Sequence, residues 1–422
     1  MLNMKVKKFV SIFFTVFVLI TVCAGNKCYA QLDDKNTRPK AKWLRDRGPF
    51  DPRPYDNTLL GAGLINEDYF NFKNQLWIKN GISFGGYISA NVQWGSVGAP
   101  AHGISEALLL FTWEPVRTSK SAGRLVIGIA HDQTFGRPTT REFADNQRIA
   151  ETPNDLDTDP DLIFTTLGLL HWEHEWRTSP NGGLGIRAGQ LYGPSYFGPA
   201  RYLDDDRRFF MARPLAAASG AQWVGNNDIG LGIIGVAWET PWYISLGCMD
   251  GKANRQYPDF ESLMDGQMLY LVEVGYEYDV DGPNEAALRL TVSHLDVQGG
   301  GGPGQSFMIS GDIHFWNQLS LAARWSKSFN RLTSDYKDNI SLGILLVTPF
   351  GRTQDLAGLG GFLGQPGASN YKRESGFELF YKLQLTQAIS LTPDLQYWYR
   401  KDDGTSGNVN TWVWGLRSEI EF

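Results

Sequence analysis

The last twelve residues, TWVWGLRSEIEF from Thr411 to Phe422, decide the fold class of this chain. From Trp412 onward every second residue is apolar apart from Ser418, and the positions between them are mostly polar or charged. Side chains of a β-strand point alternately to opposite faces, so this period of two predicts a strand with one apolar and one polar face. The chain ends on the apolar face of that strand, with Phe422.

Residues 1–30 have the composition of a secretory leader. Lysines within Lys5–Lys8 precede an apolar run from Phe9 to Cys23, and Cys28-Tyr29-Ala30 forms a small-residue cleavage site before Gln31. This is the pattern of a signal peptide, and its apolar run is too short to span a bilayer comfortably as a helix. We therefore expect an exported protein.

A leader at one end and a terminal aromatic residue at the other are typical of outer-membrane β-barrels. In that class the last residue is part of the assembly signal, so we predict this role for Phe422. An edge strand of a soluble β-protein is the alternative that the closing stretch leaves open.

Composition restricts the function classes. The chain has 422 residues and a formal net charge of −6, and the leader holds four lysines and no acids, so its removal leaves −10 (−6 − 4). This acidic balance argues against a nucleic-acid partner. Only Cys248 lies outside the leader, so neither an intrachain disulfide nor a cysteine metal cluster is expected. No apolar run after the leader reaches helix-spanning length, which excludes a helical membrane protein.

Alternating segments recur from Gly81 to the end of the chain. Gln31–Asn74 is polar and interrupted by prolines, and Phe70–Asn80 could form a short helix. We predict about 16 strands over the 392 residues that remain after 30 of 422 are removed, or about 25 residues per strand and connection, which suits a membrane barrel. The regular strands are Ile82–Trp94, Arg124–His131, Leu184–Leu191, Ile229–Trp238, Tyr270–Tyr278, Ala287–His294, Phe307–Phe315, Leu319–Ser326, Ile340–Val347, Phe377–Leu385, Ile389–Tyr399 and Trp412–Phe422. The less regular ones are Ala107–Trp113, Phe164–Trp176, Trp242–Cys248 and one within Arg208–Trp223.

The predicted connections alternate in length, as expected for a barrel with two unlike rims. Phe315–Gln318 and Thr386–Ala388 are predicted as short turns. Long insertions are predicted at His131–Leu162, Asp250–Gln267, Asp296–Gln305, Asn330–Asp338 and Gly351–Ser375. We therefore divide the chain into a signal peptide at 1–30, a periplasmic, plug-like extension at 31–80 and an all-β, transmembrane antiparallel barrel at 81–422.

Several strands oppose a stripe of apolar residues with full charges. A soluble barrel would bury the apolar stripe, whereas a membrane barrel turns it to lipid and keeps the charges in a wet lumen. Tryptophan and tyrosine at the ends of the apolar faces favour the membrane arrangement, because these rings suit an interface. The candidate pore-lining residues are Arg187, Glu273, Glu277, Arg289, Arg324, Glu378, Lys382, Asp394, Arg417 and Glu419.

Three polar motifs have competing interpretations. The acidic run Asp155–Asp161 could bind a cation but is more typical of a solvated loop. Asp204–Arg208 (DDDRR) favours a local salt-bridged turn, with a pore constriction as the alternative. His171 and His174 fall on opposite faces of one strand, so they do not predict a metal site. No catalytic motif is present, and we expect no enzyme activity, cofactor or metal.

Several stretches resemble the carbohydrate-selective (OprB-like) porins of Gram-negative outer membranes. The most specific is SLTPDLQY at Ser390–Tyr397 followed by Gly415-Leu416-Arg417. IRAGQL at Ile186–Leu191, KNGI at Lys79–Ile82 and the hairpin at Glu374–Leu385 are similar to other parts of the family. The resemblance spans about Trp77–Phe422 and implies a 16-stranded channel for sugars, with charged and aromatic side chains at its constriction.

These observations predict an outer-membrane porin for passive diffusion of small hydrophilic solutes, with carbohydrates as the expected class. A general or ion-preferring porin is one alternative, and a secreted soluble β-rich glycan-binding protein is another. The expected partners are small sugars or other hydrophilic solutes, outer-membrane lipid and lipopolysaccharide, and the barrel assembly machinery. A homo-oligomer is left open, and the sequence names neither the solute nor the constriction residues.

Overall fold

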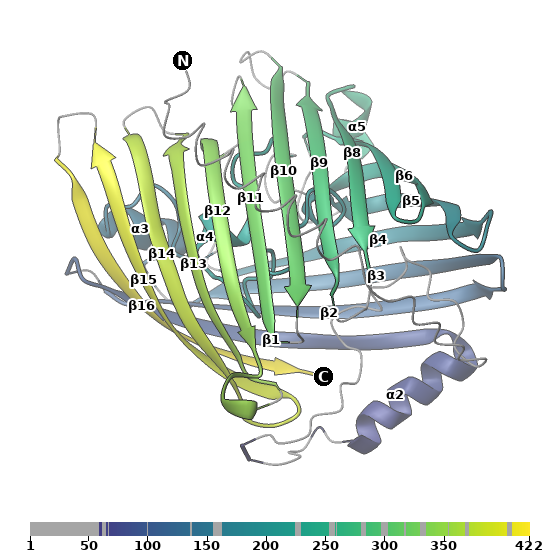
Figure 1. Ribbon diagram of the computed structural model, residues 1–422, viewed down its shortest axis with the longest axis horizontal. Coiled ribbons are helices and arrows are strands. Elements are labelled where there is room, and N and C mark those ends of the chain that lie inside the picture. The colour runs from purple at the N-terminus through teal and green to yellow at the C-terminus, as the bar shows by residue number, and fades with distance from the viewer. Residues whose placement is uncertain are drawn as a thin grey trace.

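Within the described residues, sixteen antiparallel strands close into one barrel (Figure 1). The computed structural model describes residues 59–60, 65, 67–98, 100–135, 137–154, 163–223, 229–252, 258, 260–279, 284–296, 303–315, 318–329, 335–352, 354–367, 371–402 and 407–422. Each strand pairs with its neighbours in sequence, and β1 pairs with β16 to close the sheet. The strands are β1 (Ile82–Gly95), β2 (His102–Arg117), β3 (Ser121–Thr134), β4 (Ile163–Arg177), β5 (Gly182–Tyr192), β6 (Ile229–Glu239), β7 (Trp242–Asp250), β8 (Met268–Tyr278), β9 (Ala286–Leu295), β10 (Gly304–Phe315), β11 (Leu319–Phe329), β12 (Tyr336–Val347), β13 (Leu356–Pro366), β14 (Tyr371–Gln384), β15 (Ile389–Asp402) and β16 (Val409–Glu421).

The faces of the barrel are inverted relative to those of a soluble protein. On β16, Trp414 is 45% exposed, whereas Arg417 is 1% exposed. Exposed and buried positions alternate along this strand, with most of the large apolar side chains outside and the charged ones inside. The same alternation places leucine, isoleucine and tryptophan on the outer surface of most strands. An apolar outer face with a polar interior is the pattern of a barrel that spans a membrane.

The two rims differ, as the sequence predicted. At one rim the connections span 118–120, 178–181, 240–241, 279–285, 316–318, 348–355 and 385–388, and we call this the short-turn rim. At the other, the long-loop rim, the connections at 135–162, 193–228 and 251–267 are the longest. The insertions predicted at Asp296–Gln305 and Asn330–Asp338 coincide with connections at 296–303 and 330–335 on this rim, which are shorter than predicted.

Two strand assignments were wrong, although the total of sixteen is correct. Arg208–Trp223 is not a strand but part of a segment inside the barrel. β13 lies within Gly351–Ser375, which was predicted as an insertion. Its sequence is rich in glycine, and a Cβ atom added at Gly360 would lie only 2.7 Å from Phe210 of that interior segment. The sequence of β13 therefore shows no polar face, because glycines at its inward positions leave room for side chains such as Phe210.

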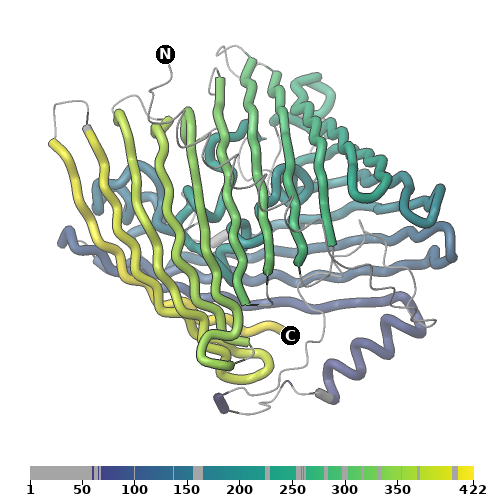
Figure 2. The backbone as a smooth tube through the Cα atoms, viewed as in Figure 1, coloured from purple at the N-terminus to yellow at the C-terminus, as the bar shows by residue number. Residues whose placement is uncertain are grey.

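A helix, α2 (Glu67–Asn80), precedes the barrel at the short-turn rim (Figure 2). It includes the predicted helix at Phe70–Asn80. Phe72 packs against Phe84, with ring centroids 6.5 Å apart, and Phe84 shares the outward face of β1 with Ile88. Arg117 Nη1 donates to the carbonyl oxygen of Trp77 at 2.6 Å. In this helix the N-terminal extension lies against the outside of the barrel. Within the described ranges, no helix is long and apolar enough to cross a membrane.

Candidate functional site

The connection between β5 and β6 folds into the barrel, and its described part, residues 193–223, is called the interior segment here. It contains the short helices η1 (Gly193–Ser195) and α4 (Arg213–Ala216). Phe197, Leu203 and Phe210 are completely or almost completely buried. An apolar connection buried in this way cannot be a solvated surface loop, because its side chains need partners on the inner wall.

The interior segment runs from the long-loop rim nearly to the short-turn rim and back. Arg208 Nε lies 3.2 Å from Glu421 Oε1, at the end of β16 on the short-turn rim. On the return, the backbone N–H of Gln222 donates to Ser306 Oγ at 2.9 Å, near the long-loop end of β10. The DDDRR run lies at the deep end of this path. Arg207 and Arg208 both pair with Asp205, so the local salt-bridged turn is present, and it lies inside the barrel.

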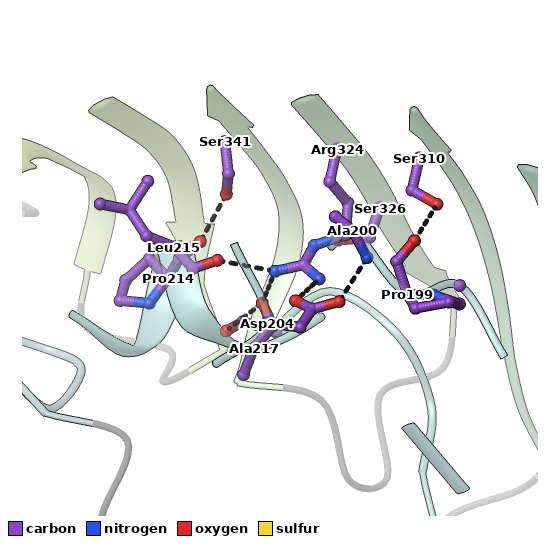
Figure 3. Close-up of polar contacts among 12 residues, drawn as sticks. Pro199, Ala200, Asp204, Pro214, Leu215, Ala217, Ser310, Arg324, Ser326 and Ser341 are labelled. Atoms are coloured by element: carbon purple, nitrogen blue, oxygen red, sulfur yellow. Dashed lines mark hydrogen bonds and ion pairs between the residues drawn. The ribbon is translucent and has the colours of Figure 1, made fainter. Parts of the chain in front are cut away.

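Arg324 on β11 is the centre of one anchor of the interior segment (Figure 3). Its guanidinium forms an ion pair with Asp204 and donates to the carbonyl oxygens of Leu215, at 2.9 Å, and Ala217. Burial raises the pKa of Asp204 above its usual range, and the ion pair with Arg324 acts in the opposite direction. One arginine thus joins two distant turns of the interior segment to the barrel wall.

The ten predicted pore-lining residues all occupy inward positions of their strands. Six of them form hydrogen bonds or ion pairs with the interior segment: Glu273, Glu277, Arg289, Arg324, Glu378 and Arg417. The other four bind to neighbouring side chains of the wall: Arg187 to Glu173, Lys382 to Glu419, and Asp394 to Gln396. Their contact with a solute stays a prediction. The sequence reasoning found their direction but missed that most of them hold a folded segment.

A second piece of chain also enters the barrel from the long-loop rim. It follows β3 and contains α3 (Thr140–Asn146), which starts with a capping box between Thr139 and Glu142. Beyond the helix, the backbone N–H of Ala150 donates to Glu374 of β14 at 2.6 Å. The sequence reasoning missed this element, although the T-x-x-E spacing at Thr139–Glu142 is a recognisable helix start. The acidic run Asp155–Asp161 lies outside the described residues.

Two apolar clusters fix both pieces of chain. One joins Phe143, Leu203 and Phe210 to inward-facing Phe380 and Trp398 on the wall formed by β11 to β16. The other packs the beginning and end of the interior segment against β5 to β10. Burying one large apolar side chain is worth about 1.5–3 kcal/mol, so the clusters hold the segment firmly. Much of the barrel interior is therefore a folded core.

The inner face of β2, β3 and β4 differs from other parts of the inner wall in the solvent exposure of its side chains. The described inward positions of β9, β11 and β15 are all buried. On β2–β4, by contrast, six inward side chains at mid-depth or toward the long-loop rim are partly exposed: Glu106, Leu108, Leu110, Ala130, Asp132 and Leu169. Inside a closed barrel, such side chains can meet solvent only within the interior. The space beside β2–β4 is therefore the candidate solute pathway.

This wall has three layers between the rims. An acidic pair, Glu106 and Asp132, lies toward the long-loop rim, and the two residues are paired across β2 and β3. An aliphatic band of Leu108, Leu110, Ala130 and Leu169 occupies mid-depth. Below it lies a charged cluster of Arg124, His171, Glu173 and Arg187.

The charged cluster is closely hydrogen-bonded. Arg124 Nε and Arg187 Nε lie 2.5 Å and 2.7 Å from the two oxygens of Glu173, and His171 Nε2 lies 3.1 Å from one of them. His174 lies on the opposite face of β4, as predicted. Among the residues described, no group of three or more histidine, cysteine or acidic side chains could hold a metal ion.

The interior segment supplies aromatic and cationic groups opposite this wall. Tyr196 Oη lies 3.4 Å from His171 Nε2, and the guanidinium of Arg187 lies 4.3 Å from the centre of the Tyr196 ring. Near the acidic pair, Arg207 lies 3.9 Å from the centre of the Tyr87 ring, and Tyr87 donates a hydrogen bond to Glu106. Groups of both charge signs therefore face the candidate pathway.

Comparisons with known proteins agree with this geometry. Residues 314–422 match the family described as carbohydrate-selective porin, OprB family. The C-terminal part of the chain therefore matches a porin family, and the barrel as a whole has a porin fold. The high-pH structure of OprB from Pseudomonas putida has the same fold, with a TM-score of 0.68, 14% identity, and coverage of 87% of this chain and 99% of that one. The low-pH structure of that protein gives a TM-score of 0.52 at 12% identity, covering 87% of this chain and 100% of that chain. No curated protein sequence matches this chain.

These findings support the predicted family and the membrane barrel. The matched region begins at the end of β10 and includes SLTPDLQY and Gly415-Leu416-Arg417, on which the resemblance depended. The porin fold and the matched family description indicate a channel of the outer membrane. The alternatives, a general or ion-preferring porin and a secreted soluble β-rich glycan-binding protein, are not favoured.

Proposed function

We propose that this porin passes small, neutral, polyhydroxylated solutes, sugars above all, by passive diffusion along the inner wall of β2–β4. The observation that carries the proposal is the partial exposure of this wall, whereas the inward positions of β9, β11 and β15 are buried. The family description of residues 314–422 as a carbohydrate-selective porin supports the solute class.

The chemistry of the wall suits hydroxyl groups. The carboxylates of Glu106 and Asp132 accept hydrogen bonds from sugar hydroxyls, and Arg187 and Arg207 donate to the hydroxyl oxygens. Such contacts replace part of the water that a sugar loses on entering a narrow pore. Because groups of both signs lie close together, their fields largely cancel at longer distances, and neutral dipolar solutes are favoured over ions of one sign.

The predicted lumen charges have a positioning role in this proposal. Glu273, Arg289, Arg324, Glu378 and Arg417 hold the interior segment through its backbone or side chains. The interior segment in turn narrows the barrel and leaves the space beside β2–β4. Loss of these anchors changes the bore and not the contacts made by the solute.

A second part of the proposal concerns export and assembly. We propose that residues 1–30 are removed after Ala30 and that the barrel assembly machinery recognises Phe422. The outer apolar faces then contact lipid, and lipopolysaccharide surrounds the long-loop rim. N-terminal sequencing of the outer-membrane form would give Gln31 as the first residue, and a retained leader would contradict this part of the proposal.

Liposome swelling tests the transport proposal directly. Purified protein in vesicles should admit glucose and other monosaccharides much faster than disaccharides or trisaccharides. Lysine hydrochloride and sodium glutamate of similar size serve as charged comparison solutes. Swelling with neither sugars nor small polyols, in vesicles that hold correctly folded barrels, would refute the proposal.

A further inference from the structure

The aliphatic band forms a continuous apolar surface across three strands. Leu108 pairs with Ala130, while Gly128 pairs with both Leu110 and Leu169. A Cβ atom added at Gly128 would lie 3.1 Å from the Leu169 Cβ, so no side chain separates Leu110 from Leu169. The four members therefore make one patch.

The side chains of the band face the barrel interior. The residues next to them in sequence, Leu109, Ile129 and Leu170, are 54%, 45% and 37% exposed on the outer surface. Since successive side chains of a strand point to opposite faces, Leu108, Leu110, Ala130 and Leu169 point inward. The regular register between β2 and β3 over this region agrees with that direction.

The band differs from the other apolar side chains of the interior. Phe380 and Trp398 are 2% and 0% exposed, because the interior segment and the β3–β4 connection cover them. The members of the band are partly exposed and belong to neither apolar cluster. An apolar patch in contact with water is unfavourable unless it binds something.

We propose that the aliphatic band is a contact surface for the C–H face of a ring-form sugar. This inference rests on the proposed function and names the feature of the solute that is recognised. A pyranose with equatorial hydroxyls has a polar edge and two faces of C–H groups. The acidic pair above and the charged cluster below can bind the edge while a face lies on the band. An open-chain polyol has the same hydroxyl groups but no such face.

The dimensions fit one sugar ring. Leu108 and Leu110 are two residues apart, or about 7 Å along the strand at about 3.3 Å per residue. The band is thus about as long as one pyranose ring, with hydrogen-bonding groups at both ends. It is aliphatic, so it contributes through apolar contact and not through stacking on an aromatic ring.

The test compares glucose with sorbitol, its open-chain polyol, in liposome swelling. Leu108→Asn and Leu110→Asn keep the side-chain size and add polarity, while Leu110→Met keeps the site apolar as the matched control. The ratio of glucose rate to sorbitol rate should fall by about threefold or more in the asparagine variants, which corresponds to losing part of one apolar contact. The ratio in Leu110→Met should stay close to that of the wild type.

Separate readouts distinguish the possible failures. Heat-modifiable migration and ion conductance report whether each variant forms a barrel. An unchanged ratio in folded asparagine variants overturns the inference and leaves the transport proposal standing. Absence of swelling with both solutes in the wild type overturns the transport proposal itself. If the asparagine variants do not assemble, Ala130→Ser makes a smaller polar change at the same band, and an unchanged ratio there also overturns the inference.

Discussion

Replacing Arg324 with alanine should loosen the interior segment without opening the barrel. The Arg324 side chain is 1% exposed, and its partner Asp204 is 23% exposed. The substitution leaves this carboxylate and the carbonyl oxygens of Leu215 and Ala217 without their cationic donor. Arg324 lies in mid-strand, but the sixteen-strand backbone ladder does not depend on its side chain.

The cost can be worked out from these contacts. Removing one partner of a buried ion pair costs about 3–5 kcal/mol, and we take the lower end because Asp204 keeps some access to solvent. A local cost of about 3 kcal/mol raises the population of the opened segment about a hundredfold. An open segment no longer narrows the pore, so both mean conductance and current noise should increase.

Single-channel recording in planar bilayers measures this effect. Lys327→Ala is the matched control, because it removes a cation from the outward face of the same strand. Asp204→Asn should produce a smaller increase than Arg324→Ala, since the two carbonyl contacts of the arginine persist. Conductance and noise equal to those of the wild type in folded Arg324→Ala barrels would refute the anchoring role.

Three further predictions concern the packing, titration and assembly of the barrel. Gly360→Ala should disturb the interior segment, because its Cβ would lie 2.7 Å from Phe210 and 2.9 Å from Leu215. The control is Gly361→Ala, whose Cβ would meet only the carbonyl oxygen of Gly376, at 3.7 Å. A larger conductance is expected for Gly360→Ala alone, and equal conductances of the two variants would contradict the packing. Burial, reinforced by Asp335, raises the pKa of Glu151 well above its usual range. A carboxyl with a raised folded-state pKa contributes stability when protonated and loses it as the pH rises through that pKa. Glu151→Gln should therefore gain in thermal stability over the wild type as the pH is raised above the ordinary carboxyl range, and a constant difference would speak against it. Deleting Phe422 should reduce the outer-membrane yield in cells but leave refolding in detergent nearly intact, because one terminal ring contributes only about 1.5–3 kcal/mol; equal yields in cells would exclude an assembly role.

The barrel could be predicted from the sequence because one face of each membrane strand meets lipid and the other meets the barrel interior. Strands such as β16 alternate strictly, since Trp414 meets the lipid side and Arg417 the interior. β13 was not predicted as a strand because glycines, Gly360 among them, occupy inward positions where other strands have polar residues. Its glycines become understandable only once Phe210 is known to pack against them.

The interior of the barrel could not be predicted in the same way. Its contacts join residues far apart in the chain, as when the backbone N–H of Met211 donates to Glu378 at 2.8 Å. Periodicity indicates that Glu378 points inward, but it carries no information on which backbone group it will meet. For the same reason, the partly exposed wall of β2–β4 follows only from knowing where the interior segment packs.

Cysteine accessibility tests most directly whether the solute pathway runs beside β2–β4. In a Cys248→Ser background, single cysteines are placed at Leu108 and Ala130 on this wall, and at Ala322 and Ser326 beneath the interior segment. A small, membrane-impermeant thiol reagent should label the first two and lower the single-channel conductance, and it should leave the second two largely unmodified. Labelling at Ala322 and Ser326 without labelling at Leu108 and Ala130 would place the pathway on the other side of the barrel and contradict the account.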